Sequence, residues 1–400
     1  MDFEESEDQK AIADMASRLM RDCLSDERRV RLYGVEREPL RAFDKDGWQA
    51  VADAGLLGLM VSEAAGGSGL GMAEAGKVLE AQGAALMPMP LLQTMAVVLP
   101  LLDQFADGDQ QANLMPALMD GSRIATLAAP LMAFGHVSRA HAVAKDGGYE
   151  LSGALHAVPF AQEADYILLS ADLPDGQSII VLLDRSGLRI DPGLAMSGEG
   201  ADSLHLDGVV VLPDRVLATG VEAMKARARL RDWALTGIAA LQLGVLEEAL
   251  RRTAAYTSER QQFGRPLAGF QAVTQQAADA FMVIEALRGI YWKSCVACDL
   301  GQDAALDAHA ANWWVAEAGH QVAHTVLHLH GGIGQDLEYP IHRFFLWAKH
   351  LGMLMGSTPE NLQVIGAIAA AEGGERLMPD YAIQPGAPGD TPFWTEGKIA

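Results

Sequence analysis

The stretch SERQQFGRPLAGFQ, residues 258–271, joins two apolar helical patterns and concentrates several chemically useful side chains in a short loop. Arg260 carries a planar guanidinium, which can give two charge-assisted hydrogen bonds to a diphosphate. Phe263 can cover an adenine or ribose face, and Gln271 can donate to the same diphosphate. An ordinary surface loop with a solvated arginine is the alternative. The combination of these residue types favours nucleotide binding.

A second informative stretch, HLHGGIGQDLEYP, covers residues 328–340. Gly331 and Gly332 follow an apolar helical run, and glycines at a helix end let backbone amides approach a bound anion closely. Pro340 begins another helical segment, in the first turn, where its missing N–H costs nothing. Alone, the glycines predict only a helix cap and a loop. Beside residues 258–271 they point to a second part of a binding site.

Composition limits the classes of protein that fit this chain. Its 400 residues, half of them apolar, predict two or three domains. The net charge of −22 argues against binding to nucleic acid or to an anionic membrane surface. No uncharged apolar run is long enough to span a bilayer, and residues 2–5 are mostly acidic instead of resembling a targeting segment. Only three cysteines are present, too few for a disulfide scaffold, so we expect a cytoplasmic protein.

The chain alternates between two kinds of periodicity. Residues 1–120 are predicted to form an N-terminal helical domain, with helices expected over 7–21, 48–60, 74–87 and 91–103. Residues 121–215 are predicted to form a small antiparallel barrel or sandwich, because short β-branched runs alternate with Gly, Asp and Pro. These runs cover 124–127, 137–143, 149–152, 166–170, 178–183 and 209–212. Helical periodicity returns over 216–371, which predicts a bundle, and residues 372–400 are expected to be an extended tail.

With these motifs and this order of elements, the chain resembles the acyl-CoA dehydrogenase family over nearly its whole length. Members are flavoproteins that oxidise an acyl-CoA thioester to its 2-enoyl form. The resemblance implies an α+β multi-domain fold: an N-terminal helical domain, a middle antiparallel β-domain and a C-terminal four-helix bundle that forms a tetramer core. It also implies that FAD is bound across a subunit interface, and that an electron-transfer acceptor reoxidises it. The implied cofactor-binding residues are Arg260, Phe263, Gln271, Gly331, Gly332, Ser357 and Thr358.

The catalytic pattern of the family is broken in this sequence. The reaction needs a carboxylate that removes the α-proton while the flavin accepts a hydride. Counted from Glu338-Tyr339-Pro340, the family's usual base position falls on Met355, and the alternative position on the preceding long helix falls on Ala234. A thioether and a methyl group cannot accept a proton at neutral pH. Asp232 is a weak candidate for a displaced base.

Other family positions have changed as well. The flavin-covering Trp-Ile-Thr segment falls on Ala157-Val158-Pro159, and an Arg-Asp pair falls on Leu346-Trp347. The segment that contacts flavin and acyl-CoA falls near 128–130 and is lost over 131–135. The resemblance is therefore to the base-lacking subunit of heteromeric dehydrogenases for steroid side-chain CoA esters, in a tetramer with a glutamate-bearing subunit. A self-sufficient homomer that uses Asp232 and a structural or regulatory homologue without flavin remain as alternatives.

Two further motifs do not enter this interpretation. His320, His324 and His328 recur at intervals of four on one helix face, a spacing that could hold zinc or copper. No carboxylate or cysteine cluster accompanies them, so structural or interface histidines are favoured and no metal site is predicted. Cys295 and Cys298 form a C-x-x-C pattern without a second pair, and packing is favoured over metal or redox chemistry.

Overall fold

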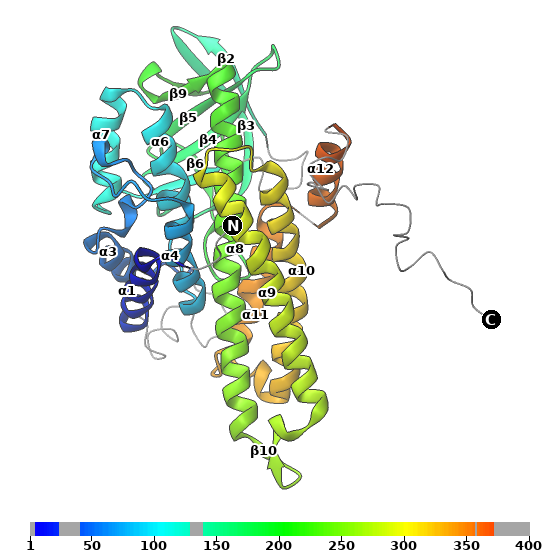
Figure 1. The fold of residues 1–400 in the computed structure, drawn as a ribbon. Coiled ribbons are helices and arrows are strands. Elements are labelled where there is room, and N and C mark those ends of the chain that lie inside the picture. Colours follow the sequence, from blue (N-terminus) through cyan, green and yellow to red (C-terminus); the bar gives the residue numbers. More distant parts are fainter. Residues whose placement is uncertain (1–4, 24–40, 129–138, 357, 372–400) are drawn as a thin grey trace, which may run out of the picture.

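The computed structural model describes residues 5–23, 41–128, 139–356 and 358–371. Figure 1 shows N-terminal helices on one side, a β-sheet above, and long helices that extend below both. The predicted tail over 372–400, the predicted flavin-binding Ser357 and the altered segment 131–135 lie outside the described residues. The predicted order of helices, strands and helices is confirmed.

The N-terminal layer consists of short helices packed on one another. Their bounds are α1 Glu7–Cys23, α3 Lys45–Asp53, η1 Leu56–Gly58, η2 Glu63–Ala65, α4 Met72–Ala85, α5 Leu91–Gln93, the π-helical turn η3 Thr94–Val98, α6 Leu99–Phe105 and α7 Gly108–Met119. The single helix expected over 48–60 is wrong, because α3 ends at Asp53 and Gly55 adopts a φ of +72°. Glycine takes this left-handed conformation at little cost and turns the chain into η1.

The middle region is one nine-stranded sheet in the order β6-β7-β3-β2-β4-β5-β9, with β1 on β4 and β8 on β3. The strands are β1 Ala125–Ala128, β2 Arg139–Lys145, β3 Gly148–Pro159, β4 Tyr166–Asp172, β5 Ser178–Asp184, β6 Arg189–Asp191, β7 Ala201–His205, β8 Val209–Val211 and, after η5 Pro213–Arg215, β9 Val216–Thr219. Most pairs are antiparallel, as expected, but β4 runs parallel to β1 and to β2. Buried side chains of these strands form a second hydrophobic core, separate from the main core of the helices.

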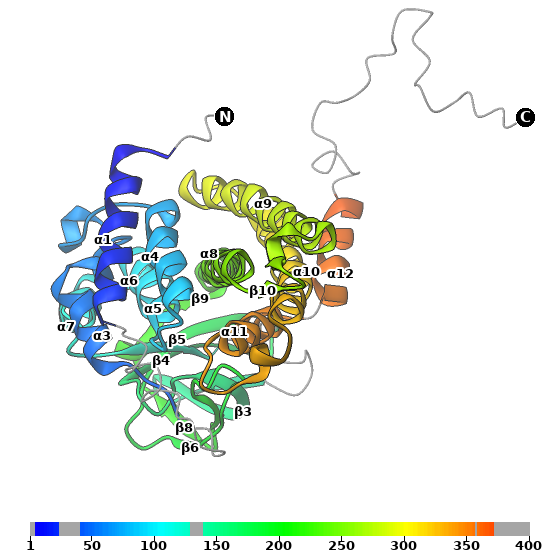
Figure 2. The same ribbon diagram turned by 90° about the horizontal axis from the view of Figure 1, so that it is seen from below.

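The C-terminal helices form the predicted bundle. They are α8 Gly220–Glu259, α9 Gln271–Asp299, α10 Ala305–His330, α11 Ile341–Leu354 and α12 Thr358–Ala371. Short elements join them: the strands β10 Gln261–Gln262 and β11 Arg265–Pro266, and the 3₁₀ turns η6 Leu267–Gly269 and η7 Gly331–Gln335. Helix α8 packs against α4, α9, α10 and α11, and Figure 2 shows it near the centre of the surrounding helices.

The N-terminal layer is fixed tightly to the bundle where α4 crosses α8. A Cβ atom added at Gly244 would lie 1.9 Å from the Glu80 carbonyl oxygen, and one at Gly83 would lie 2.1 Å from that of Leu241. Glycine is therefore required on both helices for this close approach. At the start of α4, the Asp299 carboxylate accepts hydrogen bonds from the backbone amides of Met72 (2.6 Å) and Ala73 (3.3 Å).

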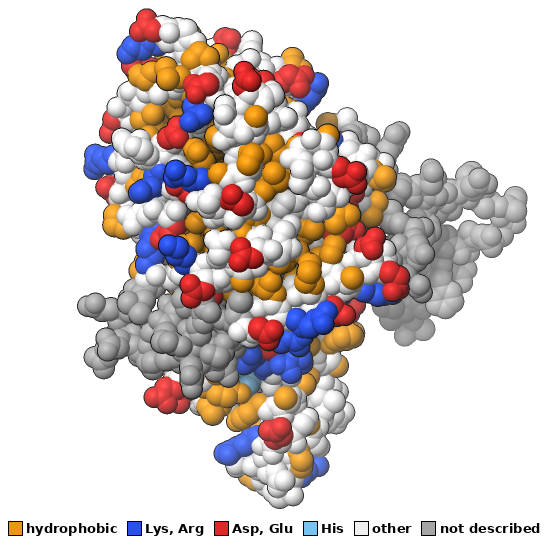
Figure 3. Space-filling view, turned by 90° about the vertical axis from the view of Figure 1, so that its left-hand side faces the viewer, with side chains coloured by type: hydrophobic (Ala, Val, Ile, Leu, Met, Phe, Trp, Pro, Cys, Tyr) orange, Lys and Arg blue, Asp and Glu red, His pale blue; other side chains and the backbone are white. Residues whose placement is uncertain are grey.

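Among the described residues, α8 is the one helix long and apolar enough to cross a bilayer, but 89% of its most apolar window is buried inside the molecule. An apolar helix that is buried on all sides is expected at the centre of a helical bundle. The surface in Figure 3 mixes acidic and basic side chains among apolar ones. The net charge of −22 therefore does not make this face uniformly acidic.

Candidate functional site

The predicted nucleotide-binding loop lies at the far end of the bundle from the sheet (Figure 1). After α8 ends at Glu259, strands β10 and β11 form a hairpin whose tip residue, Phe263, has a φ of +54° and is 91% exposed. Its ring lies edge-on to that of Phe270, at a centroid distance of 6.2 Å, and the Arg265 guanidinium lies 3.9 Å from the Phe270 ring centroid. The side chains of Arg260 and Gln271 are also exposed. The hairpin thus presents an aromatic ring and an arginine to whatever molecule lies beyond it.

The glycine stretch meets the same end of the bundle. The His330 ring stacks on Tyr256 at a centroid distance of 4.5 Å, which joins the end of α10 to the end of α8. Gly331 then caps α10 with a φ of +64°, and a Cβ added at Gly331 or Gly332 would meet no atom within 4 Å. The structure therefore places the two stretches at the same end of the bundle, with open space beside the glycine backbone.

The family's base position lies elsewhere, between α11 and α12. Met355 is 4% exposed, belongs to the main hydrophobic core, and accepts a hydrogen bond on its carbonyl oxygen from Asn312 Nδ2 at 3.1 Å. Gly356 follows with a φ of +97°, and Thr358 begins α12. Leu354, directly before Met355, lines a cavity between the sheet and the helices, whereas Met355 is not among its lining residues.

This cavity lies where the resemblance puts the flavin ring, because Ala157 and Pro159 of the ring-covering segment form part of its wall. Its volume is about 40 Å³, room for no more than a few water molecules. The indole of Trp347, 1% exposed, fills the space beside it. In its present form the cavity does not fit the three fused rings of a flavin.

The cavity wall is mostly apolar but contains several polar side chains. Glu199 and His350 both line it, with 4.0 Å between Glu199 Oε2 and His350 Nε2. Burial raises the pKa of Glu199 to about 8, although a hydrogen bond from Ser197 opposes this, and burial lowers the pKa of His350 to about 4. Gln82 Oε1 and Trp347 Nε1 have no hydrogen-bond partner among the described atoms. Sequence reasoning missed this group, because its members are far apart in the chain and belong to no motif.

Asp232 and Ala234 are both buried in α8. The Asp232 carboxylate accepts a hydrogen bond from Arg231 Nε at 2.8 Å; burial raises its pKa and the arginine opposes the shift. Leu241, the α8 residue in the cavity wall, lies nine residues beyond Asp232, about 13 Å along the helix axis. The structure does not bring Asp232 to this cavity.

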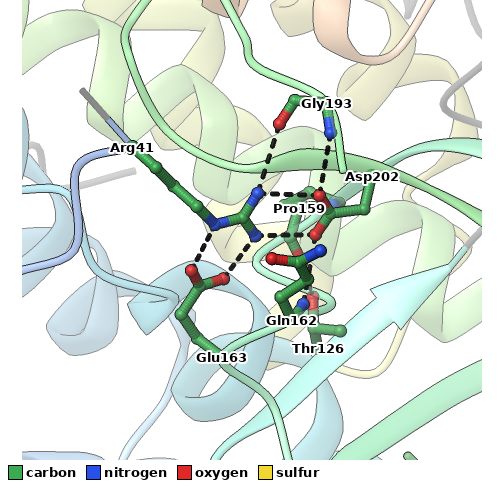
Figure 4. Close-up of polar contacts among 7 residues, drawn as sticks. All are labelled: Arg41, Thr126, Pro159, Gln162, Glu163, Gly193 and Asp202. Atoms are coloured by element: carbon green, nitrogen blue, oxygen red, sulfur yellow. Dashed lines mark hydrogen bonds and ion pairs between the residues drawn. The ribbon is translucent and has the colours of Figure 1, made fainter. Parts of the chain in front are cut away.

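An ion-pair cluster holds two walls of the cavity together (Figure 4). Arg41 pairs with Glu163 through both Nε and Nη2, and with Asp202 through two contacts of 2.7 Å. Asp202, fully buried, also accepts hydrogen bonds from the backbone amides of Gln162 and Gly193 at 3.1 Å. The cluster thus ties the segment after Pro159 and the segment around Gly200 to the N-terminal layer.

The histidine row and the cysteine pair behave as packing and surface groups. The His320 and His324 rings are 4.5 Å apart, and Lys349 contacts His320 Nδ1. In the part of the chain that the structure describes, no group of three or more His, Cys, Asp or Glu is arranged to hold a metal ion. Cys295 and Cys298 are buried free thiols, and burial raises both pKa values, that of Cys298 to about 12, which disfavours the reactive thiolate.

Comparison with known proteins tests the family assignment. Models of the acyl-CoA dehydrogenase N-terminal and C-terminal domains match residues 6–122 and 232–369. The chain belongs to the acyl-CoA dehydrogenase family. It is 33% identical to acyl-CoA dehydrogenase FadE27 of Mycobacterium tuberculosis over 81% of this chain and 88% of the relative. The predicted family, its oxidoreductase class and the predicted fold are therefore confirmed.

Solved structures add information on assembly. The ChsE4-ChsE5 complex of Mycobacterium tuberculosis has a chain 30% identical, with a TM-score of 0.86 over 93% of this chain and 99% of that one. A variant of the Tcur3481-Tcur3483 steroid acyl-CoA dehydrogenase has a chain 37% identical, with a TM-score of 0.82 over 92% of this chain and 99% of that one. Both are complexes of two differently named chains, the type that the sequence resembles. FAD, the predicted cofactor, is bound in a structure of PigA, which shares the fold at 22% identity and a TM-score of 0.82 over 94% of this chain and all of that one.

Proposed function

We propose that this chain is the base-lacking subunit of a two-chain, FAD-dependent acyl-CoA dehydrogenase, whose substrate is the CoA ester of a steroid side chain. The observation that carries the proposal is the contrast between the two ends of the predicted flavin site. The hairpin and the glycine stretch present Arg260, Phe263 and open backbone to a neighbour. The cavity at the flavin-ring position within the same chain is nearly closed, and the family's base position is the buried Met355.

In this proposal each of the two subunits supplies a different part of the active site. This chain holds the adenosine diphosphate half of an FAD whose flavin ring lies in the partner, through Arg260, Phe263, Gln271, Gly331 and Gly332. The partner supplies the ring pocket and the glutamate base. The bound flavin would supply the hydride acceptor, and a separate electron acceptor would reoxidise it. A cytoplasmic tetramer is part of the same proposal.

The remaining carboxyl groups do not replace the lost base. Glu199 is the carboxyl that lines the ring cavity, but that cavity has no room for both a flavin ring and an acyl thioester. Asp232 is about 13 Å along α8 from the cavity wall and is paired with Arg231. A homomeric enzyme with Asp232 as base is thereby disfavoured. The exposed nucleotide-binding side chains disfavour a homologue that binds no flavin.

The test is co-expression with a glutamate-bearing dehydrogenase subunit, followed by measurement of bound flavin and of acyl-CoA oxidation with an artificial electron acceptor. We expect the complex to be yellow and active, and this chain alone to be inactive. Arg260→Ala should weaken FAD binding roughly 10- to 150-fold, because it removes a charge-assisted contact of about 1.5–3 kcal/mol. Arg185→Ala, at an exposed position directly after β5, is the matched control and should retain flavin.

Three results would overturn the proposal. Full turnover by the isolated chain, lost in Asp232→Asn, would establish the homomeric alternative. A colourless and inactive complex would favour the structural homologue. Unchanged flavin content in the Arg260→Ala complex would show that the hairpin does not hold the cofactor.

A further inference from the structure

The closed cavity between the sheet and the helices is lined by two side chains that each carry an unpaired buried polar atom. Gln82 of α4 and Trp347 of α11 both line this cavity and are 2% and 1% exposed. Gln82 Oε1 and Trp347 Nε1 are shielded from solvent, and neither has a hydrogen-bond partner in the part of the chain that the structure describes. Buried polar groups are almost always hydrogen-bonded, to protein or to ordered water. Two such atoms at one cavity therefore point to a small polar molecule within it.

The amide of Gln82 fits its surroundings in one orientation only. Its Nε2 donates to the carbonyl oxygen of Met87 at 2.9 Å and to that of Met89 at 2.7 Å. If the amide were turned over, Oε1 would face these two oxygens, and no hydrogen bond would form because all three atoms are acceptors. Gln82 Oε1 is therefore an acceptor that needs a donor.

Trp347 has the opposite requirement. The indole Nε1–H can only donate, so it needs an acceptor. A single molecule that satisfies both Gln82 and Trp347 must donate and accept hydrogen bonds. An ammonium ion cannot accept the indole hydrogen, and a halide ion cannot donate to the amide oxygen. Water does both, and it is the usual partner of such groups in polar cavities.

Glu199 and His350 provide two further contacts for the same molecule. Glu199 Oε2 and His350 Nε2 are 4.0 Å apart, too far for a direct hydrogen bond but a separation that one water molecule can bridge. Ser197 Oγ donates to Glu199 Oε2 at 2.9 Å, which leaves the carboxyl group able to make further bonds. Burial raises the pKa of Glu199 to about 8 and lowers that of His350 to about 4. Both groups are therefore largely neutral at pH 7 and do not form an ion pair.

We propose that this cavity binds one ordered water molecule. A volume of about 40 Å³ has room for water but not for an organic ligand. The water donates to Gln82 Oε1 and accepts from Trp347 Nε1. It also bridges Glu199 Oε2 and His350 Nε2, which gives it the number of partners typical of buried water. It thereby joins α4, the segment before β7 and α11, and holds the cavity closed.

The test is nuclear magnetic resonance on the full chain, deuterated and labelled with nitrogen-15 at the tryptophan indoles. A dipolar cross-peak between an indole Nε1–H and water reports a water molecule held beside that indole. Rotating-frame spectra separate this contact from proton exchange, because the two give opposite signs. We expect the dipolar cross-peak at Trp347. The variant Trp347→Phe should remove it and so assigns the signal.

Trp48 is the matched control in the same spectrum. It is also buried, at 2% exposure, but its Nε1 donates to the Gly121 carbonyl oxygen at 2.9 Å. Its hydrogen-bonding requirement is therefore met by the protein, and we expect no water cross-peak there.

Variants at Glu199 test the bridge. Glu199→Leu removes the carboxyl group, so the water loses a partner and the cross-peak at Trp347 should lose most of its intensity. Glu199→Gln keeps a donor and an acceptor and should retain the cross-peak. It also removes the exchangeable carboxyl proton, so a signal that survives is not relayed through that proton. If Glu199→Leu does not fold, His350→Leu removes the other end of the bridge and should have the same effect.

Three results would overturn this inference. Absence of a water cross-peak at Trp347 in the wild type would show that the cavity is dry. Equal cross-peaks at Trp347 and Trp48 would show that water enters the core generally instead of binding at this site. An unchanged cross-peak in the leucine variant would show that no bridge exists. The proposed function is tested separately, by flavin content and acyl-CoA oxidation, and none of these results would affect it.

Discussion

The buried carboxyl of Glu199 has a measurable consequence for stability. Its pKa is raised to about 8 in the folded chain, against 4.5 for the ordinary group, because burial disfavours the charged form. Between these two values the folded state holds a proton that the unfolded state has released. The free energy of unfolding should therefore fall as the pH rises through this window. His350, whose pKa is lowered to about 4, is neutral in the folded state over this window. Its unfolded form loses the rest of its proton just above pH 6.5, which raises the free energy of unfolding slightly and equally in any variant that keeps His350.

Glu199→Gln tests this at residue scale. From pH 6.5 to 8.0 the wild type should lose about 2 kcal/mol of unfolding free energy through this group, at about 1.4 kcal/mol per pH unit. The variant should lose much less, because its amide does not titrate. Urea unfolding at several pH values measures the difference. Glu317→Gln, an exposed residue of α10, should follow the wild type. Parallel curves for wild type and Glu199→Gln would contradict the raised pKa.

At the scale of elements, helices α4 and α8 cross so closely at Gly244 that no residue with a side chain fits there. A Cβ at Gly244 would lie 1.9 Å from the Glu80 carbonyl oxygen, and this backbone atom cannot move aside as a flexible side chain could. Gly244→Ala should lower the free energy of unfolding by at least about 2 kcal/mol, since overpacking forces the two helices apart. Chemical denaturation followed by circular dichroism measures this.

Gly289 on α9 is the matched control for that substitution. It also lies inside a helix, but a Cβ there would meet no atom within 4 Å. Gly289→Ala should raise the free energy of unfolding by about 0.4–1 kcal/mol, because alanine restricts the unfolded chain and favours the helix. The two alanine substitutions should therefore have opposite signs. The same sign for both would mean that helix propensity, and not the α4–α8 contact, decides the effect.

The helices show which parts of the fold the apolar sequence pattern predicts and which parts it misses. Apolar periodicity predicted α1, α4 and the long bundle helices, because each buries one face against a neighbour. It missed the end of α3 at Gly55, since one glycine hardly alters an apolar pattern while its left-handed conformation ends the helix. The close approach at Gly244 gave no signal either, because a glycine inside a helical pattern reads only as a weak helix former.

For the candidate site, the sequence shows groups of residues that are near one another in the chain and gives no sign of those that are far apart. The hairpin and the glycine stretch are short motifs, and the structure brings both to one end of the bundle. The pair of Glu199 and His350 is separated by most of the C-terminal half of the chain, so only the tertiary structure reveals it. The histidine row was visible as a pattern. The hollow that His324 and His328 line together with His342 depends on α11, about which the spacing of the row says nothing.

At the scale of the whole molecule, Arg41 connects the N-terminal layer with the sheet. Its guanidinium makes paired contacts with Glu163 and with Asp202, which has no exposed surface, and also donates to the Gly193 carbonyl at 3.2 Å. The pKa of Arg41 is raised mainly by the hydrogen bond to Glu163. Two carboxylates are held close together because one cation pairs with both of them. Without it, a buried carboxylate would have no opposite charge.

Arg41→Ala should therefore lower the free energy of unfolding by about 3–5 kcal/mol, the usual effect of removing one partner from a buried ion pair. Arg41→Lys should recover only part of this loss, because an ammonium group cannot make paired contacts with both carboxylates. Urea unfolding followed by circular dichroism and by tryptophan fluorescence measures the change. Arg189→Ala, at a residue whose side chain is 66% exposed beside Asp191, should change stability by no more than about 0.5 kcal/mol. If Arg41→Ala were as stable as that control, the packing of the sheet on the helices would hold the two layers together without the ion pairs.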